Sequence, residues 1–146
     1  MSNRVIVMHG VNFDQLERRD AELYGGLSLT ELETKVRGFA RELELQVSFA
    51  QTNFEGEFCE YLHRAGLSAD GLLLNPGAWT HYSWAIRDAL DLSGLPAVEV
   101  HLSAVDDREE WRRVSVIREL CLGCVQGKGV DGYRDGLAML KEGLPA

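Results

Sequence analysis

The stretch LLLNPGAWTHYSWAIRD, residues 72–88, passes from a wholly apolar run through a Pro-Gly break into a segment rich in polar side chains. An apolar run without polar alternation is typical of a parallel strand that is covered on both faces, and the Pro-Gly pair predicts that the strand ends abruptly. Ligands of open parallel sheets bind outside the carboxyl ends of the strands. We therefore expect four exposed polar residues where a substrate docks: Asn75, Thr80, His81 and Ser83. The alternative is an ordinary Asn-Pro-Gly turn with His81 as a surface residue.

Composition narrows the classes of protein that fit. The 146 residues, 45% hydrophobic and 26% charged, predict one domain that spans residues 1–146. The net charge of −8 argues against nucleic acid or an anionic membrane as a partner. No apolar run approaches ~20 residues, and the apolar segment at the start is too short for a secretory signal, so we expect a cytoplasmic protein. Three cysteines, an odd number, fit free thiols better than a disulfide framework.

Apolar strands alternate with helices along the chain. The predicted strands cover residues 4–8, 45–51, 70–75, 95–102 and 122–126, and the predicted helices 28–43, 55–65, 83–92 and 130–141. Residues 11–26 are predicted to form a long loop of the kind that acts as a lid, and residues 108–113 a short helical turn. This alternation predicts an α/β fold, namely a flavodoxin-like doubly wound five-stranded parallel sheet with helices on both faces.

Glu99 and His101 stand two residues apart at the end of the fourth predicted strand, so their side chains point to the same face. Either group buried alone would cost several kcal/mol to desolvate, whereas together they satisfy one another. A carboxylate that holds an imidazole fixes its tautomer, which is how a general acid is prepared. The alternative is a structural His-Glu pair without a catalytic role.

Two motifs near the carboxyl terminus are weak. Cys121 and Cys124 have redox spacing, but the redox motif opens a helix after a strand, whereas these cysteines enter or lie in a strand. We therefore interpret them as structural thiols. The sequence GKGVDG at residues 127–132 matches the dinucleotide fingerprint, but no later strand supplies the acid that binds ribose. We interpret it as a turn that starts a helix.

Several motifs occur together in the order and spacing of a known family. They are NPGAWTH with Ser83 and Arg87-Asp88 after it, VEVHLS, REEWR and DGY, together with Gly10, Asn12, Leu16, Arg19, Tyr24 and Gly25. The set covers nearly the whole chain and resembles type II 3-dehydroquinate dehydratase. The resemblance implies conversion of 3-dehydroquinate to 3-dehydroshikimate by anti elimination of water through an enolate. It also implies that no metal or cofactor takes part, and that the enzyme is a homo-oligomer, usually a dodecamer built from trimers.

The resemblance also implies a role for each matched residue. Tyr24 would remove the proton next to the ketone, and Arg19 would favour its phenolate. His101, oriented by Glu99, would protonate the departing hydroxyl group. Asn12 would hold a water molecule that stabilises the enolate oxygen. The remaining residues would bind substrate, the first three its carboxylate and the others its ring hydroxyls: Asn75, Leu102, Ser103, His81, Asp88 and Arg112.

The departures from the family pattern are concentrated in two segments. They are His9, Val11, Phe13, Asp14 and Glu17 in the amino-terminal motif NGPNLNxLGxRxPxxYG, and Ala104 and Asp106 after HLS. Added carboxylates near the entrance would repel an anionic substrate. The departures leave two alternatives: a lyase for a different β-hydroxy ketone or polyol in a specialised pathway, and a non-catalytic binding module. A module of that kind has no need of both a base and an acid.

Overall fold

The computed structural model describes residues 2–145, and its centre is a five-stranded sheet. The strands are β1 (Arg4–His9), β2 (Gln46–Gln51), β3 (Gly71–Asn75), β4 (Ala97–His101) and β5 (Gly123–Gln126). They lie in the order β2-β1-β3-β4-β5, and every neighbouring pair is parallel. This is the flavodoxin-like doubly wound order, so the predicted fold class is confirmed.

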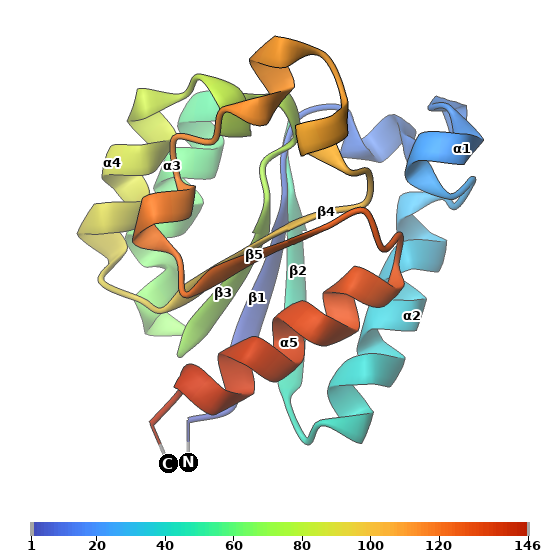
Figure 1. The fold of residues 1–146 in the computed structure, drawn as a ribbon. Helices are drawn as coiled ribbons and strands as arrows, with labels where there is room; N and C mark the ends of the chain where they lie inside the picture. The colour runs from blue at the N-terminus through green and yellow to red at the C-terminus, as the bar shows by residue number, and fades with distance from the viewer. Residues whose placement is uncertain (1, 146) are drawn as a thin grey trace.

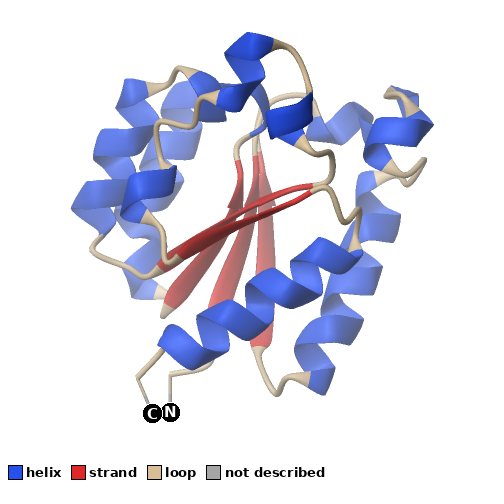
Figure 2. Ribbon diagram, viewed as in Figure 1, coloured by secondary structure: helices blue, strands red, loops and turns tan. Residues whose placement is uncertain are grey.

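Helices cover both faces of the sheet (Figure 1 and Figure 2). One face carries α2 (Leu29–Glu42) and α5 (Asp131–Gly143), and the other carries α3 (Glu55–Arg64) and α4 (Trp84–Ser93). The start of α2 is fixed by a capping box, in which the Glu31 backbone donates to Ser28 Oγ and the Ser28 backbone donates to Glu31 Oε1, both at 3.1 Å. In the described residues no helix is long and apolar enough to cross a membrane.

The apolar run of β3 lies between two hydrophobic cores. Leu73 packs into the core beneath α2 and α5, whereas Leu72 and Leu74 pack into the core beneath α3 and α4. Successive strand residues point to opposite faces, and here both faces are covered, so all three leucines are fully buried. The run lacks polar alternation because both faces of β3 are buried, as predicted.

The prediction that the residues after β3 are exposed is wrong. Asn75, Thr80, His81 and Ser83 are all buried. The chain turns through the 3-10 helix η3 (Gly77–His81) directly into α4. Ser83 caps α4 by accepting from the Ile86 backbone at 3.0 Å, and the Thr80 carbonyl accepts from the Val116 backbone at 2.9 Å. Thr80 and Ser83 thus hold the fold together, and only Asn75 and His81 reach the pocket described below.

The segment predicted as a long loop contains two helical pieces. A 3-10 helix η1 (Phe13–Arg18) is followed by α1 (Ala21–Tyr24), which Asp20 caps by accepting from the Glu22 backbone at 2.9 Å. Phe13 and Leu16 are buried in the core beneath α2 and α5. Their anchoring makes this segment part of the packed structure, which a pattern without sustained periodicity could not indicate. The segment presents Tyr24 at its end.

The ends of β1 and β3 approach so closely that only glycine fits at position 10. Its backbone donates to the Asn75 carbonyl at 2.9 Å, and an added Cβ would lie 2.0 Å from the carbonyl oxygen of Pro76.

We expect Gly10→Ala to lower the free energy of unfolding by roughly 1–3 kcal/mol or more, because the clash is with backbone. Urea denaturation measures this loss in the free energy of unfolding. Gly38→Ala in α2, where the Cβ meets nothing, is the control and should stabilise by about 0.5–1 kcal/mol. Equal stability of the two variants would contradict the close approach.

Candidate active site

A pocket opens at the carboxyl edge of the sheet, between the segments that follow β1, β3 and β4. It brings together every predicted site residue except Glu99 and Asp88: Asn12, Arg19, Tyr24, Asn75, His81, His101, Leu102, Ser103 and Arg112. Glu99 is completely buried and contacts His101. Asp88 is exposed on α4 and does not line this pocket. Three separate loops thus supply a single small polar cavity.

The phenolic oxygen of Tyr24 accepts hydrogen bonds from two arginines. Arg19 Nη2 lies 2.6 Å from it and Arg108 Nη1 lies 2.7 Å from it. A guanidinium group only donates, so neither arginine can accept a proton from the phenol. The ionised phenolate, in contrast, gains from both positive charges. The geometry therefore suits a phenolate at Tyr24.

Sequence reasoning missed Arg108 as a site residue. Its guanidinium also donates to Ser103 Oγ at 3.2 Å, so it joins the tyrosine to the loop that follows β4. Tyr24 and Arg108 are 84 residues apart. The sole signal in the sequence is that Arg108 opens the REEWR motif, which gives no hint of contact with the amino-terminal segment.

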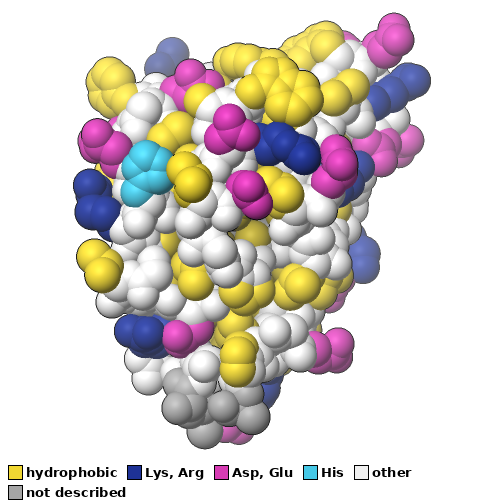
Figure 3. Space-filling model, turned by 90° about the vertical axis from the view of Figure 1, so that its left-hand side faces the viewer, with side chains coloured by type: hydrophobic (Ala, Val, Ile, Leu, Met, Phe, Trp, Pro, Cys, Tyr) yellow, Lys and Arg dark blue, Asp and Glu magenta, His cyan; other side chains and the backbone are white. Residues whose placement is uncertain are grey.

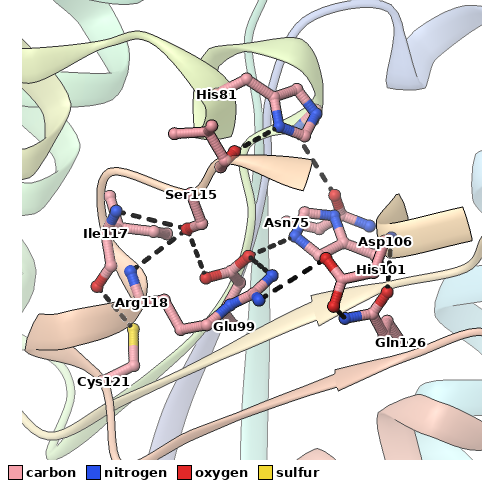
Figure 4. Close-up of polar contacts among 12 residues, drawn as sticks. Asn75, His81, Glu99, His101, Asp106, Ser115, Ile117, Arg118, Cys121 and Gln126 are labelled. Carbon is pink, nitrogen blue, oxygen red and sulfur yellow. Dashed lines mark hydrogen bonds and ion pairs between the residues drawn. The ribbon is translucent and has the colours of Figure 1, made fainter. Parts of the chain in front are cut away.

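On another side of the pocket His101 is held by Glu99, as predicted. His101 Nε2 lies 2.6 Å from Glu99 Oε2 (Figure 4). Since an ionised carboxylate can only accept, Nε2 carries the proton in this bond. The imidazole is therefore fixed in orientation and keeps Nδ1 for other partners.

Two further residues, which the sequence did not indicate, hold the carboxylate of Glu99. Ser115 Oγ donates to Oε1 at 2.8 Å, and Arg118 Nη2 donates to Oε2 at 3.3 Å (Figure 4). Burial opposes ionisation, but the hydrogen bond and charge of His101, the Ser115 hydroxyl and the Arg118 charge outweigh it, so the pKa of Glu99 is lowered. The carboxylate is thus kept negative behind the imidazole.

His81 and Asn75 are fixed from outside the pocket. His81 Nδ1 lies 2.7 Å from the Val114 carbonyl, so this nitrogen carries a proton and Nε2 is left for another partner. Burial lowers the pKa of His81, although the Val114 carbonyl opposes the shift. Asn75 Nδ2 donates to Tyr133 Oη at 3.1 Å. Both side chains are therefore held in one orientation before any ligand arrives.

His9 is one of the residues that depart from the family pattern, and it is completely buried beneath this site. Its Nε2 lies 2.8 Å from Tyr133 Oη, the same oxygen to which Asn75 donates. Its Nδ1 has no partner among the described residues. Burial lowers the pKa of His9 to about 3. The imidazole is therefore neutral at physiological pH and belongs to the network that orients Asn75.

This burial predicts acid sensitivity. Below pH 6.5 the unfolded chain protonates His9, whereas the folded chain does so only near pH 3. Protonation therefore favours unfolding, and His9 lowers the free energy of unfolding by roughly 2–3 kcal/mol between pH 6 and pH 4. We expect His9→Asn to lose less stability than wild type over this range, as urea denaturation at the two pH values measures. Parallel pH profiles of the two proteins would contradict a buried neutral imidazole.

Asn12 and Arg112 are the remaining predicted residues that line the pocket. Asn12 has a left-handed backbone (φ 72°), which asparagine tolerates, and its backbone donates to Asn53 Oδ1 at 2.8 Å. Arg112 Nε donates to Glu109 Oε2 at 2.6 Å. Asp14, which accepts from Asn53 Nδ2 at 3.0 Å, is exposed and does not line the pocket. Glu17 is likewise exposed outside it, so the added carboxylates leave the pocket lining itself unchanged.

Neither of the two weak motifs lines the pocket. Burial and the nearby Glu99 carboxylate raise the pKa of the Cys121 and Cys124 thiols to about 12, so neither is a reactive thiolate at neutral pH. Gly127 and Gly129 have positive φ angles of 77° and 58° in the turn between β5 and α5. Such a backbone favours glycine, which explains the match to the fingerprint.

The sheet order and a polar pocket at the carboxyl edge define the chain as a doubly wound α/β protein with a small-molecule site. Residues 3–141 match the family model described as dehydroquinase class II. A 3-dehydroquinate dehydratase of Carboxydothermus hydrogenoformans is 47% identical over 94% of this chain and 89% of its own length, and one of Thermotoga petrophila is 45% identical over 97% and 96%. The crystal structure of a type II dehydroquinase from Butyrivibrio crossotus superposes with a TM-score of 0.90 at 35% identity, over 95% of this chain and 97% of that one.

The chain therefore belongs to the class II dehydroquinase family. The resemblance seen in the sequence motifs is confirmed.

Proposed function

We propose that this chain is a hydro-lyase that dehydrates 3-dehydroquinate to 3-dehydroshikimate in the shikimate pathway of aromatic amino acid biosynthesis. One observation carries the proposal. A tyrosine oxygen that accepts from two guanidinium groups and a histidine held by a buried carboxylate line the same small pocket. An elimination needs both a base and an acid in this way. The purified protein mixed with 3-dehydroquinate should generate the ultraviolet absorbance of a conjugated enone. If none appears while the ligand binds, the proposal fails.

The first step in this mechanism is proton removal by Tyr24. Its phenolate takes a proton from the carbon next to the ketone, and the bonding electrons move to the ketone oxygen to form an enolate. Arg19 and Arg108 stabilise the phenolate before the transfer. A water held by Asn12 stabilises the enolate oxygen.

The second step is loss of the hydroxyl group. The enolate oxygen re-forms the ketone, and the electrons of the enolate C=C bond form a new C=C bond to the carbon that bears the hydroxyl group. The C–O bond of that carbon breaks, and His101 gives its Nδ1 proton to the departing oxygen, so that water leaves. The Nε2 proton stays on the bond to Glu99, whose ionised state balances the positive charge of the imidazole beforehand. Proton return from Tyr24 to His101 through solvent then restores the starting state.

The side chains held around Tyr24 and His101 orient the substrate in this mechanism. Asn75, Ser103 and the Leu102 backbone bind the carboxylate, and His81 and Arg112 bind ring hydroxyls. Asn75 and His81 are held by Tyr133 and Val114, which supports a preformed site. Val11 and Phe13, which depart from the family pattern, also line the pocket, so the alternative of a different β-hydroxy ketone concerns these two positions.

The working enzyme is proposed to be a cytoplasmic single-domain homo-oligomer, a dodecamer built from trimers. One face of α4 carries three exposed residues spaced four apart, namely Trp84, Asp88 and Leu92. The Asp88 carboxylate therefore lies between two exposed hydrophobic side chains. Hydrophobic side chains are also visible on the surface over α3 and α4 (Figure 3). This stripe supports contact with a second copy, whose pocket Asp88 would enter.

Asp88→Ala should lower catalytic efficiency on 3-dehydroquinate roughly 10- to 100-fold, since a hydrogen bond to a charged group contributes about 1.5–3 kcal/mol. Glu142→Ala, an equally exposed carboxylate on α5 across the sheet, is the control and should change nothing. Steady-state kinetics and sedimentation velocity check both variants. A monomer with full activity would rule out the shared site.

A further inference from the structure

Three side chains of different chemistry share one face of the sheet at β4 and β5. Glu99 and Cys124 are register partners on these neighbouring strands, and His101 follows two residues after Glu99. Residues two apart on a strand point the same way. The carboxylate, imidazole and thiol therefore converge because of the backbone register, and one potential ligand atom from each lies within 4.8 Å of the other two.

We propose that Glu99, His101 and Cys124 bind one soft divalent cation such as Zn²⁺ or Cd²⁺, and that its binding switches off the dehydratase. The inhibition rests on the proposed role of His101 as the acid. Nitrogen, oxygen and sulfur from these residue types are the usual zinc ligands, and three of them with one water complete a tetrahedron. Bond lengths of 2.0–2.3 Å place tetrahedral ligand atoms about 3.5 Å apart. Glu99 Oε2 and His101 Nε2, now 2.6 Å apart, need to separate by about 1 Å, and the Cys124 sulfur, within 4.8 Å of both residues' ligand atoms, needs to approach by about 1 Å at most.

The contacts around Glu99 allow a cation to replace the groups that now contact its Oε2 atom. Ser115 Oγ donates to Glu99 Oε1 and is undisturbed, because the cation takes Oε2. At Oε2 it replaces the His101 Nε2 proton and the Arg118 guanidinium, which is 3.3 Å away. Arg118 also lies 3.8 Å from Asp106 and so keeps an anionic partner when it is displaced. Binding releases one proton from His101 Nε2 and one from the Cys124 thiol.

A cation on Nε2 would disable the acid without filling the substrate pocket. In the metal-free enzyme, loss of the Nδ1 proton leaves a neutral imidazole whose Nε2 proton faces Glu99. With the metal on Nε2, the same loss would leave an anionic imidazolate, so Nδ1 would be a far weaker donor. Cys124 does not line the pocket. Tyr24 and its two arginines would be untouched, and substrate could still bind.

Cadmium titration of the full-length protein tests the site. Cadmium–thiolate absorption in the ultraviolet should rise to one equivalent, and turnover should fall at least tenfold in parallel. Cys59→Ala, which removes a thiol of α3 outside this cluster, should behave like wild type. Cys124→Ala should keep normal turnover, lose the absorption band and resist the metal.

Equal inhibition of Cys124→Ala and wild type would overturn the site, as would a band that disappears in Cys59→Ala instead. A band at Cys124 with no loss of turnover would overturn the inhibition. An enzyme that shows the band but never dehydrates 3-dehydroquinate would count against the proposed function alone, because the band does not depend on activity.

Discussion

Tyr24→Phe should lower turnover of 3-dehydroquinate roughly 10²- to 10⁴-fold, the usual contribution of a general base, while ligand affinity changes little. The substitution removes only the oxygen that both arginines contact and leaves the ring in place. Steady-state kinetics and equilibrium binding of substrate measure the two effects. Tyr82→Phe, an exposed tyrosine outside the pocket, is the matched control and should be silent. Near-normal turnover by Tyr24→Phe would mean that the tyrosine only covers the substrate.

The arginine variants separate ionisation from positioning. A free phenol ionises with a pKa of about 10, so only about one in a thousand is ionised at pH 7. Arg19→Ala and Arg108→Ala each remove one of the two guanidinium donors. Each should keep a remnant of activity that rises with pH, and the double variant should show a steeper rise. A flat pH profile would indicate that the arginines position substrate instead.

His101→Ala should also remove about 10²- to 10⁴-fold of turnover and leave binding largely intact, because an acid needed as the hydroxyl departs acts mainly in the transition state. Glu99→Gln should lose a similar share of turnover, since a neutral amide cannot stabilise a positively charged imidazole as the carboxylate does. His63→Ala, an exposed histidine of α3, serves as control. Equal loss of binding and turnover by His101→Ala would make His101 a binding residue.

The sequence predicted correctly those features that depend on the spacing of residues within one strand or helix. The apolar run of residues 72–74 indicated a strand covered on both faces, and the two-residue spacing of Glu99 and His101 placed them together. Both follow from the alternation of strand side chains. The sheet order followed from the sequence of strands and helices.

The contacts that complete the site join distant parts of the chain, and no local pattern encodes them. Arg108 reaches Tyr24 across 84 residues, and Arg118 reaches Glu99 across 19. Thr80 and Ser83 were expected at the surface because they follow the abrupt end of a predicted strand. In the structure the Ser83 side chain caps α4, and the Thr80 backbone carbonyl accepts from the Val116 backbone, so both residues are covered.

The central claim is that Tyr24 removes a proton before His101 completes the elimination, and deuterium exchange tests it most directly. His101→Ala should still form the enolate, so nuclear magnetic resonance of 3-dehydroquinate in heavy water should show deuterium entering next to the ketone without enone. The half-exposed Tyr24 can exchange its proton with solvent. The double variant with Tyr24→Phe should show no exchange above the uncatalysed rate. Absence of exchange in His101→Ala, or its persistence without the tyrosine oxygen, would contradict the account.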